Sequence, residues 1–171
     1  MAMALVSDLH PPSWLAHPVA FMRHENAPDR RDRIGQWALD VKRDSFTGTV
    51  SCSLKAPRMS FDRAAVTFQF SPRTETFDAV YRVDAGPALS WRISAMALAA
   101  HGVRLQNDDA LNPSGGRVIL PYSAVVGAKT VWIRPGPKAR PRPFTIEGLS
   151  TAVAAARQAG CGADFTGALA E

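Results

Sequence analysis

Short runs in which apolar and polar residues alternate, each followed by a turn signal, constrain this chain more than any other feature. In residues 37–42 and 50–55, every second residue is apolar. A period of two indicates a strand with one buried face, because successive side chains of a strand point to opposite sides of its sheet. Residues 44–48 separate the two runs with a turn sequence, so together they predict a β-hairpin.

The same alternation recurs further along the chain. It is found in residues 66–70, 77–83, 89–93 and 144–146, and the apolar runs at residues 118–122 and 130–133 predict two further strands. Strands at this spacing, with turns between them, are typical of antiparallel sheets. We therefore expect a mainly β (α+β) fold, an antiparallel β-sandwich or barrel-like sheet of about six to eight strands. The runs at 118–122 and 130–133 are expected to pair with each other.

Two segments predict helices. Residues 94–101 are alanine-rich, with Ser94 as a candidate N-cap, and predict one short middle helix of about two turns. In the last helix, one apolar face is formed by Leu149, Ala152, Val153 and Ala156. Gly160 suits the position just after the helix end, so Cys161 can reach a strand beneath it. We expect this C-terminal helix to pack on the sheet.

The chain has two cysteines, which are too few for a disulfide scaffold or a four-cysteine zinc site. Alternation places Cys52 on the apolar face of its strand, where a bond to Cys161 would tie the last helix to an early strand. Such a bond favours an oxidising compartment, whereas two buried free thiols would fit a cytosolic protein. We expect the Cys52–Cys161 disulfide.

The predicted domain organisation has three parts. Four prolines lie within residues 1–33, so this stretch is expected to be an irregular Pro-rich arm. Its apolar residues include Trp14 and Phe21, which either pack along the domain or form part of a partner surface. A single β-rich domain is expected over residues 34–161, followed by a flexible tail over residues 162–171.

The net charge of +5 is concentrated in one segment. Four cations with no acidic residue between them supply most of it: Arg134, Lys138, Arg140 and Arg142. Prolines alternate with these cations, which predicts an extended, polyproline-like loop over residues 134–143. One local basic segment favours contact with an anionic partner and argues against a nucleic-acid footprint over the whole protein. The aromatic residues beside this segment, Trp132 and Phe144, are interpreted as core residues that flank the loop.

The sequence carries no catalytic, cofactor or metal signature. A small hydrolase would have to combine His101 and Asp108 or Asp109 with Ser114, which lacks the strand–turn–helix setting of a nucleophilic serine. Three further histidines recur every seven residues, His10, His17 and His24. The prolines between them exclude the helix on which this spacing would form a metal site. We expect no catalytic residue, cofactor or metal.

No segment approaches the ~20 apolar residues of a membrane-spanning helix. Residues 1–6 are apolar, but they are too short for a signal peptide and no cationic region precedes them. Together with the expected disulfide, this predicts a periplasmic or secreted protein whose signal peptide was removed before this numbering begins. A cytoplasmic location is the alternative.

Several residues resemble those of small extracytoplasmic proteins of Alphaproteobacteria. They are Trp37, Cys52, Phe144, Ile146, Gly148, Leu149, Ala152, Ala156 and Cys161. The pattern is distantly similar to the invasion-associated locus B family over residues 35–161. That family generally has more cysteines, including one soon after the tryptophan, where this chain has Asp40, Val41 and Lys42. The resemblance implies an extracytoplasmic compartment and a non-enzymatic role, and it implies no functional residue.

The function expected from the sequence is a non-catalytic extracytoplasmic binding or envelope-associated structural module. Its partner surface would use residues 14–22, 112–116 or 134–142. The partner would be another envelope protein, a polysaccharide or an anionic surface. One alternative is a cytosolic nucleic-acid or protein-binding accessory factor that uses the basic loop at 134–143, and another is a small hydrolase.

Overall fold

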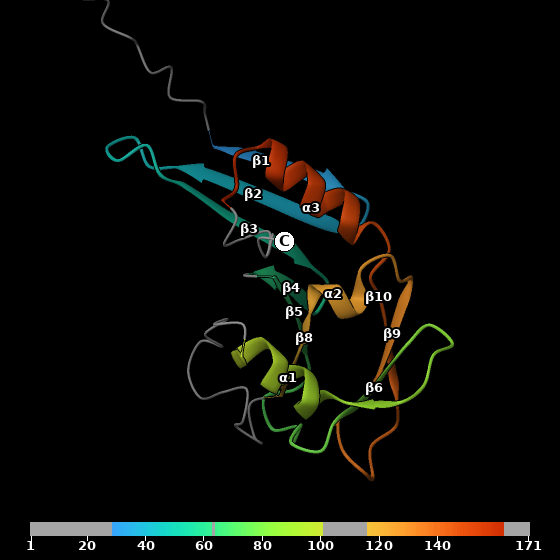
Figure 1. The fold of residues 1–171 in the computed structure, drawn as a ribbon. Coiled ribbons are helices and arrows are strands. Elements are labelled where there is room, and N and C mark those ends of the chain that lie inside the picture. The colour runs from blue at the N-terminus through green and yellow to red at the C-terminus, as the bar shows by residue number, and fades with distance from the viewer. Residues whose placement is uncertain (1–28, 63, 101–115, 163–171) are drawn as a thin grey trace, which may run out of the picture.

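The computed structural model describes residues 29–62, 64–100 and 116–162 of the 171-residue chain (Figure 1). Its elements, in order, are β1 (Arg30–Ile34), β2 (Trp37–Arg43), β3 (Val50–Ala56), β4 (Met59–Asp62), β5 (Ala65–Gln69), β6 (Val80–Val83), β7 (Leu89–Ser90), α1 (Trp91–Ala100), β8 (Arg117–Pro121), α2 (Tyr122–Val125), β9 (Thr130–Arg134), β10 (Arg142–Thr145) and α3 (Leu149–Gln158).

The strands form two antiparallel sheets. The larger has the order β1-β2-β3-β4-β5-β8 and the smaller the order β10-β9-β6-β7. This confirms the mainly β class, with two separate sheets among the described residues in place of one barrel-like sheet. The described part has ten strands, more than the six to eight expected. The sequence missed short strands such as β1, whose charged sequence RRDRI shows no apolar alternation.

The core joins both sheets and the last helix into one cluster of buried side chains. Phe68 of β5 meets Phe144 of β10 edge to face, with ring centroids 5.1 Å apart, which links the larger sheet to the smaller. Phe70 makes a similar contact with Phe144 at 5.4 Å. Edge-to-face pairs of this kind add directional attraction to the burial of apolar area.

The predicted hairpin is present as β2 and β3, in which Leu39 lies opposite Leu54 and Val41 opposite Cys52. The predicted C-terminal helix is α3, which lies across β1 and β2 in Figure 1. The beginning of α3 is close to the fully buried Trp37, because a Cβ added at Gly148 would lie 3.9 Å from its ring.

The end of α3 follows the sequence prediction. Gly160 has φ of 87°, and its N–H donates to the carbonyl of Arg157. The next N–H, that of Cys161, donates to the carbonyl of Ala156. These two bonds are the pair that defines a Schellman motif, and they turn the chain back toward the sheet. Cys161 is joined there to Cys52, with Cα atoms 5.8 Å apart.

Strand pairing differs from the sequence expectation. The runs at 118–122 and 130–133 do not pair with each other, since β8 pairs with β5 and β9 lies between β6 and β10. The short helix α2 carries the chain from one sheet to the other. Alternation identifies the buried face of a strand but does not identify its neighbour, so the partners could not be read from the pattern.

The middle helix begins earlier than predicted, at Trp91, and only Leu89 and Ser90 remain as strand. The Trp91 side chain is buried, and its indole N–H donates to the Phe77 carbonyl at 3.1 Å. Ser94 is therefore inside the helix and is not its N-cap. Its hydroxyl shares a buried hydrogen bond of 2.8 Å with the Tyr81 hydroxyl.

The expected boundaries of the N-terminal arm and of the basic loop also change. β1 begins at Arg30, so the last residues of the expected arm belong to the larger sheet. The basic segment is strand at both ends, because Arg134 is the last residue of β9 and Arg142 the first of β10. Pro143 is tolerated there because β10 is an edge strand of the smaller sheet.

Candidate binding face

The outer face of the smaller sheet carries the strongest candidate site, which we call the Arg–Trp face and define by Arg82, Trp132 and Arg134. In β9, Val131 and Ile133 are fully buried, so the residues between and after them point outward. The register places Arg82 opposite Trp132 and Val80 opposite Arg134. Arg82 and Arg134 are thus diagonal neighbours, a separation that long side chains can span.

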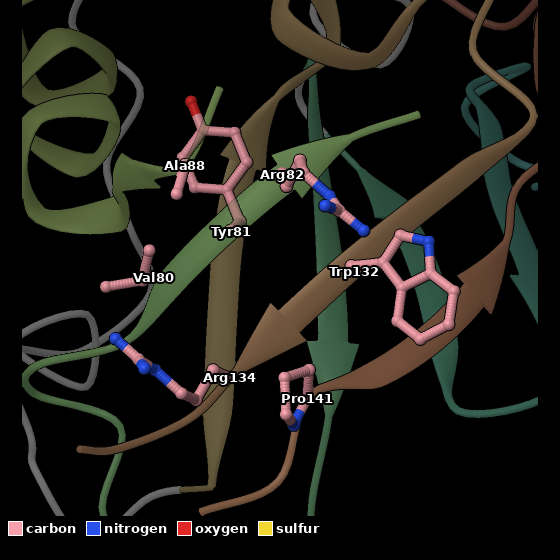
Figure 2. A pocket seen from close by; sticks show the side chains of 7 residues that line it. All are labelled: Val80, Tyr81, Arg82, Ala88, Trp132, Arg134 and Pro141. Atoms are coloured by element: carbon pink, nitrogen blue, oxygen red, sulfur yellow. The ribbon is translucent and has the colours of Figure 1, made fainter. Parts of the chain in front are cut away.

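The Arg–Trp face borders a hollow of about 240 Å³ (Figure 2). Val80, Ala88 and Pro141 contribute apolar surface to its lining. The sheet positions these groups firmly, since β6 and β9 are hydrogen-bonded strands with buried inner faces. Side chains on paired strands are better fixed in space than side chains on a loop.

The hollow is electrostatically positive. Two of the side chains that line it are arginines and none is acidic. The Arg82 guanidinium lies over the Trp132 ring, 5.8 Å from its centroid. Within the described part of the chain, neither Arg82 nor Arg134 forms an ion pair. Two unneutralised guanidinium groups beside an apolar surface attract an anion.

A second hollow, of about 550 Å³ along β1 and β3, differs in its charge. Both signs occur in its lining, which includes Asp32 as well as Arg31. Arg31 donates to the Asp40 carboxylate, and this hydrogen bond holds the pKa of Asp40 below its ordinary value. The Arg30 guanidinium lies 2.6 Å from Asp32. Carboxylates therefore lie beside Arg30 and Arg31 in this region, whereas the lining of the Arg–Trp face contains no acidic residue.

The four cations predicted as partner-binding residues are not all brought together. Arg134 joins the Arg–Trp face. Lys138 and Arg140 are exposed in the loop between β9 and β10. Arg142 lies opposite the buried Ile133, and its guanidinium stands 5.8 Å from the centre of the Phe70 ring. Arg142 is therefore at a core-facing position of its strand pair, unlike Arg134.

Sequence reasoning missed Arg82 and Trp132. We interpreted Trp132 as a core residue, and this was wrong, because 37% of the side chain is exposed. Residues 131–133 are all apolar, so their pattern contains no signal for the outward face; the structure places Val131 and Ile133 on the inner face, which leaves Trp132 on the outer one. Phe144, interpreted in the same way, is buried as expected.

Other candidate residues lie outside the part of the chain that the structure describes. They are Trp14, Phe21, His10, His17, His24, His101, Asp108, Asp109 and Ser114. Of the candidate turn at 112–116, only Gly116 is described; its carbonyl accepts a hydrogen bond of 2.7 Å from the Phe70 N–H. The expected tail over residues 162–171 also lies outside the description, except for Gly162.

Two further findings concern the described residues alone. They contain no group of three or more histidine, cysteine, aspartate or glutamate side chains that could hold a metal ion. None of the helices they form has the length and apolar character needed to cross a membrane.

Compared with known proteins, the chain matches no family model, no curated protein and no solved structure. The observations that bear on function are therefore the geometry of the Arg–Trp face and the disulfide.

Proposed function

We propose that this protein is a non-catalytic binding module of the periplasm or the extracellular space, and that it holds an anionic partner on the Arg–Trp face. The observation that carries the proposal is the pair of guanidinium groups, Arg82 and Arg134, beside a half-exposed tryptophan on a hydrogen-bonded sheet. Guanidinium groups bind carboxylates and phosphates through paired N–H donors, which favours an anion as the ligand.

The disulfide supports the proposed compartment. Cys52 and Cys161 are separated by 109 positions and link β3 to the residue that follows the α3 cap. Disulfides persist in oxidising compartments and are rare in the cytosol, where thiols are kept reduced. A location outside the cytoplasm also agrees with the distant resemblance to the invasion-associated locus B family, which remains part of the proposal.

A second candidate is a nucleic-acid-binding accessory factor. Trp132 favours it, because an exposed aromatic ring next to arginine can stack on a nucleobase. The basic loop would add Lys138 and Arg140, which are exposed near the same end of the sheet. The disulfide weighs against this candidate, because it favours a compartment outside the cytosol. The two candidate functions differ in the ligand that the protein should bind.

The experiment that tests the anion site compares two double variants with the same loss of charge. Arg82→Gln/Arg134→Gln neutralises the Arg–Trp face, whereas Lys138→Gln/Arg140→Gln neutralises the adjacent loop. Each is eluted from an immobilised sulfated polyanion, heparin, with a salt gradient. All four residues carry exposed side chains, so thermal melting is expected to confirm that both variants fold.

We expect the variant of the Arg–Trp face to lose most of its retention. Each cation that contacts the polyanion adds about one to the slope of log affinity against log salt, so this slope should fall by about two. The loop variant should stay close to the wild type. Equal losses in both variants would mean that net charge alone sets binding, and would contradict a defined site.

A further inference from the structure

We propose, on the premise of the anion-binding function above, that the ligand is an acidic polysaccharide in which one carboxylated sugar ring lies against Trp132 and its carboxylate is held by Arg82 or Arg134. The Arg–Trp face combines the two surfaces that such a ring needs. One is a flat apolar surface and the other a pair of forked cations, and both are carried by neighbouring strands.

The size of the hollow indicates how much of the ligand is recognised. Its volume of about 240 Å³ is below the roughly 300–1,000 Å³ of pockets that enclose a drug-sized ligand. The hollow therefore holds one ring-sized group, and the remainder of the ligand extends along the surface. A polymer with a charged group on each ring fits this arrangement.

The side chains match the two chemical faces of a uronate ring. A pyranose ring presents C–H groups, which carry a slight positive charge, and the face of an indole ring is negative. Val80, Ala88 and Pro141 extend the apolar surface around Trp132. The carboxylate projects from the ring edge, where its two oxygens can accept a bidentate pair of hydrogen bonds from a guanidinium. Both cations of the hollow are arginines, the residue whose planar fork suits a carboxylate.

A carboxylated glycan fits this face better than a nucleic acid. Sites for single-stranded nucleic acids stack successive bases on several aromatic rings along a positive groove. In β6, β9 and β10, Trp132 is the aromatic residue on the outer face, since Tyr81 and Phe144 are buried. A single ring flanked by two cations therefore suits one sugar at a time.

The test uses four polymers as probes and measures their binding by isothermal titration. Polygalacturonate carries carboxylates, and its fully methyl-esterified form keeps the same sugar rings without charge. Dextran sulfate offers anions on a sugar backbone without carboxylates, and oligo(dT) offers phosphates and bases. We expect polygalacturonate to bind, and its methyl ester to bind at least about tenfold more weakly because the guanidinium contacts are lost.

Variants locate the site. Trp132→Ala should weaken polygalacturonate binding roughly tenfold by removing the flat surface, whereas Trp132→Tyr should retain most of the affinity. Lys138→Gln, on the adjacent loop, should change it less than about twofold. Near-ultraviolet circular dichroism of each variant shows that the fold is kept, and the tyrosine variant keeps the test decisive if the alanine variant does not fold.

The other results are distinguishable. Binding of dextran sulfate in preference to polygalacturonate, weakened by Arg82→Gln and Arg134→Gln but not by Trp132→Ala, would keep the anion site and overturn the carboxylated sugar. Tighter binding of oligo(dT) than of polygalacturonate would overturn it in favour of a nucleic acid. Absence of binding to all three polyanions would overturn both this inference and the function on which it rests.

Discussion

Neighbouring residues of β9 have opposite roles because successive side chains of a strand point to opposite sides of its sheet. Val131 and Ile133 are fully buried and hold the smaller sheet on the core. Trp132, between them, is 37% exposed and faces the hollow. A change at Trp132 is therefore expected to affect binding more than folding, whereas truncation of Ile133 to alanine would cost about 2–5 kcal/mol of stability.

At the same scale, Asp44 organises the turn of the first hairpin. Its Oδ1 atom accepts hydrogen bonds of 2.8 Å from the N–H groups of both Phe46 and Thr47. Gly48, with φ of 71°, donates its N–H to the Asp44 carbonyl and completes the turn. Because the bonds to Oδ1 favour the charged carboxylate, they lower the pKa of Asp44, with the Thr47 bond as the largest cause.

The lowered pKa predicts a pH-dependent contribution to stability. The unfolded chain titrates Asp44 near pH 3.9, so its contribution is complete above that pH and is lost as the pH falls through the lower folded pKa. Asp44→Asn keeps an oxygen acceptor but has no charge to titrate. We expect the difference in melting temperature between wild type and Asp44→Asn to shrink below about pH 4.

Thermal melts of the two proteins between about pH 2 and pH 7 measure this difference. Carboxylates elsewhere affect both proteins equally, so only the Asp44 contribution remains in the comparison. A difference that stays constant over the whole range would show that the carboxylate charge does not stabilise the turn.

At the scale of elements, the joins between strands and helices depend on backbone conformation. Gly116 precedes β8 with φ of 61°, and a Cβ there would lie 2.2 Å from the Ser71 carbonyl oxygen. Gly127 follows α2 with φ of 78°, and a Cβ there would have no heavy atom within 4 Å. The two glycines therefore share a left-handed conformation but differ in the space around them.

This difference predicts unequal effects of alanine at the two positions. Gly127→Ala should cost about 1–2 kcal/mol, the strain of a left-handed conformation in a residue with a Cβ. Gly116→Ala should cost about 1–3 kcal/mol more, because the Cβ forces the backbone near Ser71 to move. Urea unfolding of both variants measures the two costs. Equal destabilisation would mean that the contact with Ser71 relaxes freely.

At the scale of the whole molecule, the disulfide links two parts of the chain that are 109 positions apart. Cys52 lies in β3 and Cys161 after α3, so the bond closes a loop that contains most of the domain. A loop of this length reduces the entropy of the unfolded chain by an amount worth roughly 4–5 kcal/mol, less any strain in the folded state. The bond thus stabilises the contact between the last helix and the larger sheet.

We expect Cys52→Ala/Cys161→Ala to lower the free energy of unfolding by about 2–5 kcal/mol. Urea unfolding of this variant, of the oxidised wild type and of the reduced wild type measures the loss. The reduced wild type should resemble the variant. In the unfolded but unreduced wild type, alkylating reagent should leave the intact mass unchanged; alkylation of two thiols there would show that the bond is absent.

The features that depend on neighbouring residues could be predicted from the amino-acid order alone. The β2–β3 hairpin follows from alternation around a turn, and α3 follows from apolar residues at helical spacing. The capping glycine Gly160 could be assigned from its position alone, because a residue at the end of a helix often adopts the left-handed conformation that glycine favours. These signals come from residues close together in the sequence, so the features can be predicted without knowledge of the tertiary structure.

The order of the strands in each sheet, and with it the candidate site, follows from packing in the folded molecule. Arg82 and Trp132 are far apart in the sequence and lie opposite each other because β6 pairs with β9. Trp91 begins a helix because its burial and its bond to Phe77 outweigh the alternating pattern. Side-chain periodicity specifies the face of a strand, whereas its partner depends on packing between distant segments, which no local pattern encodes.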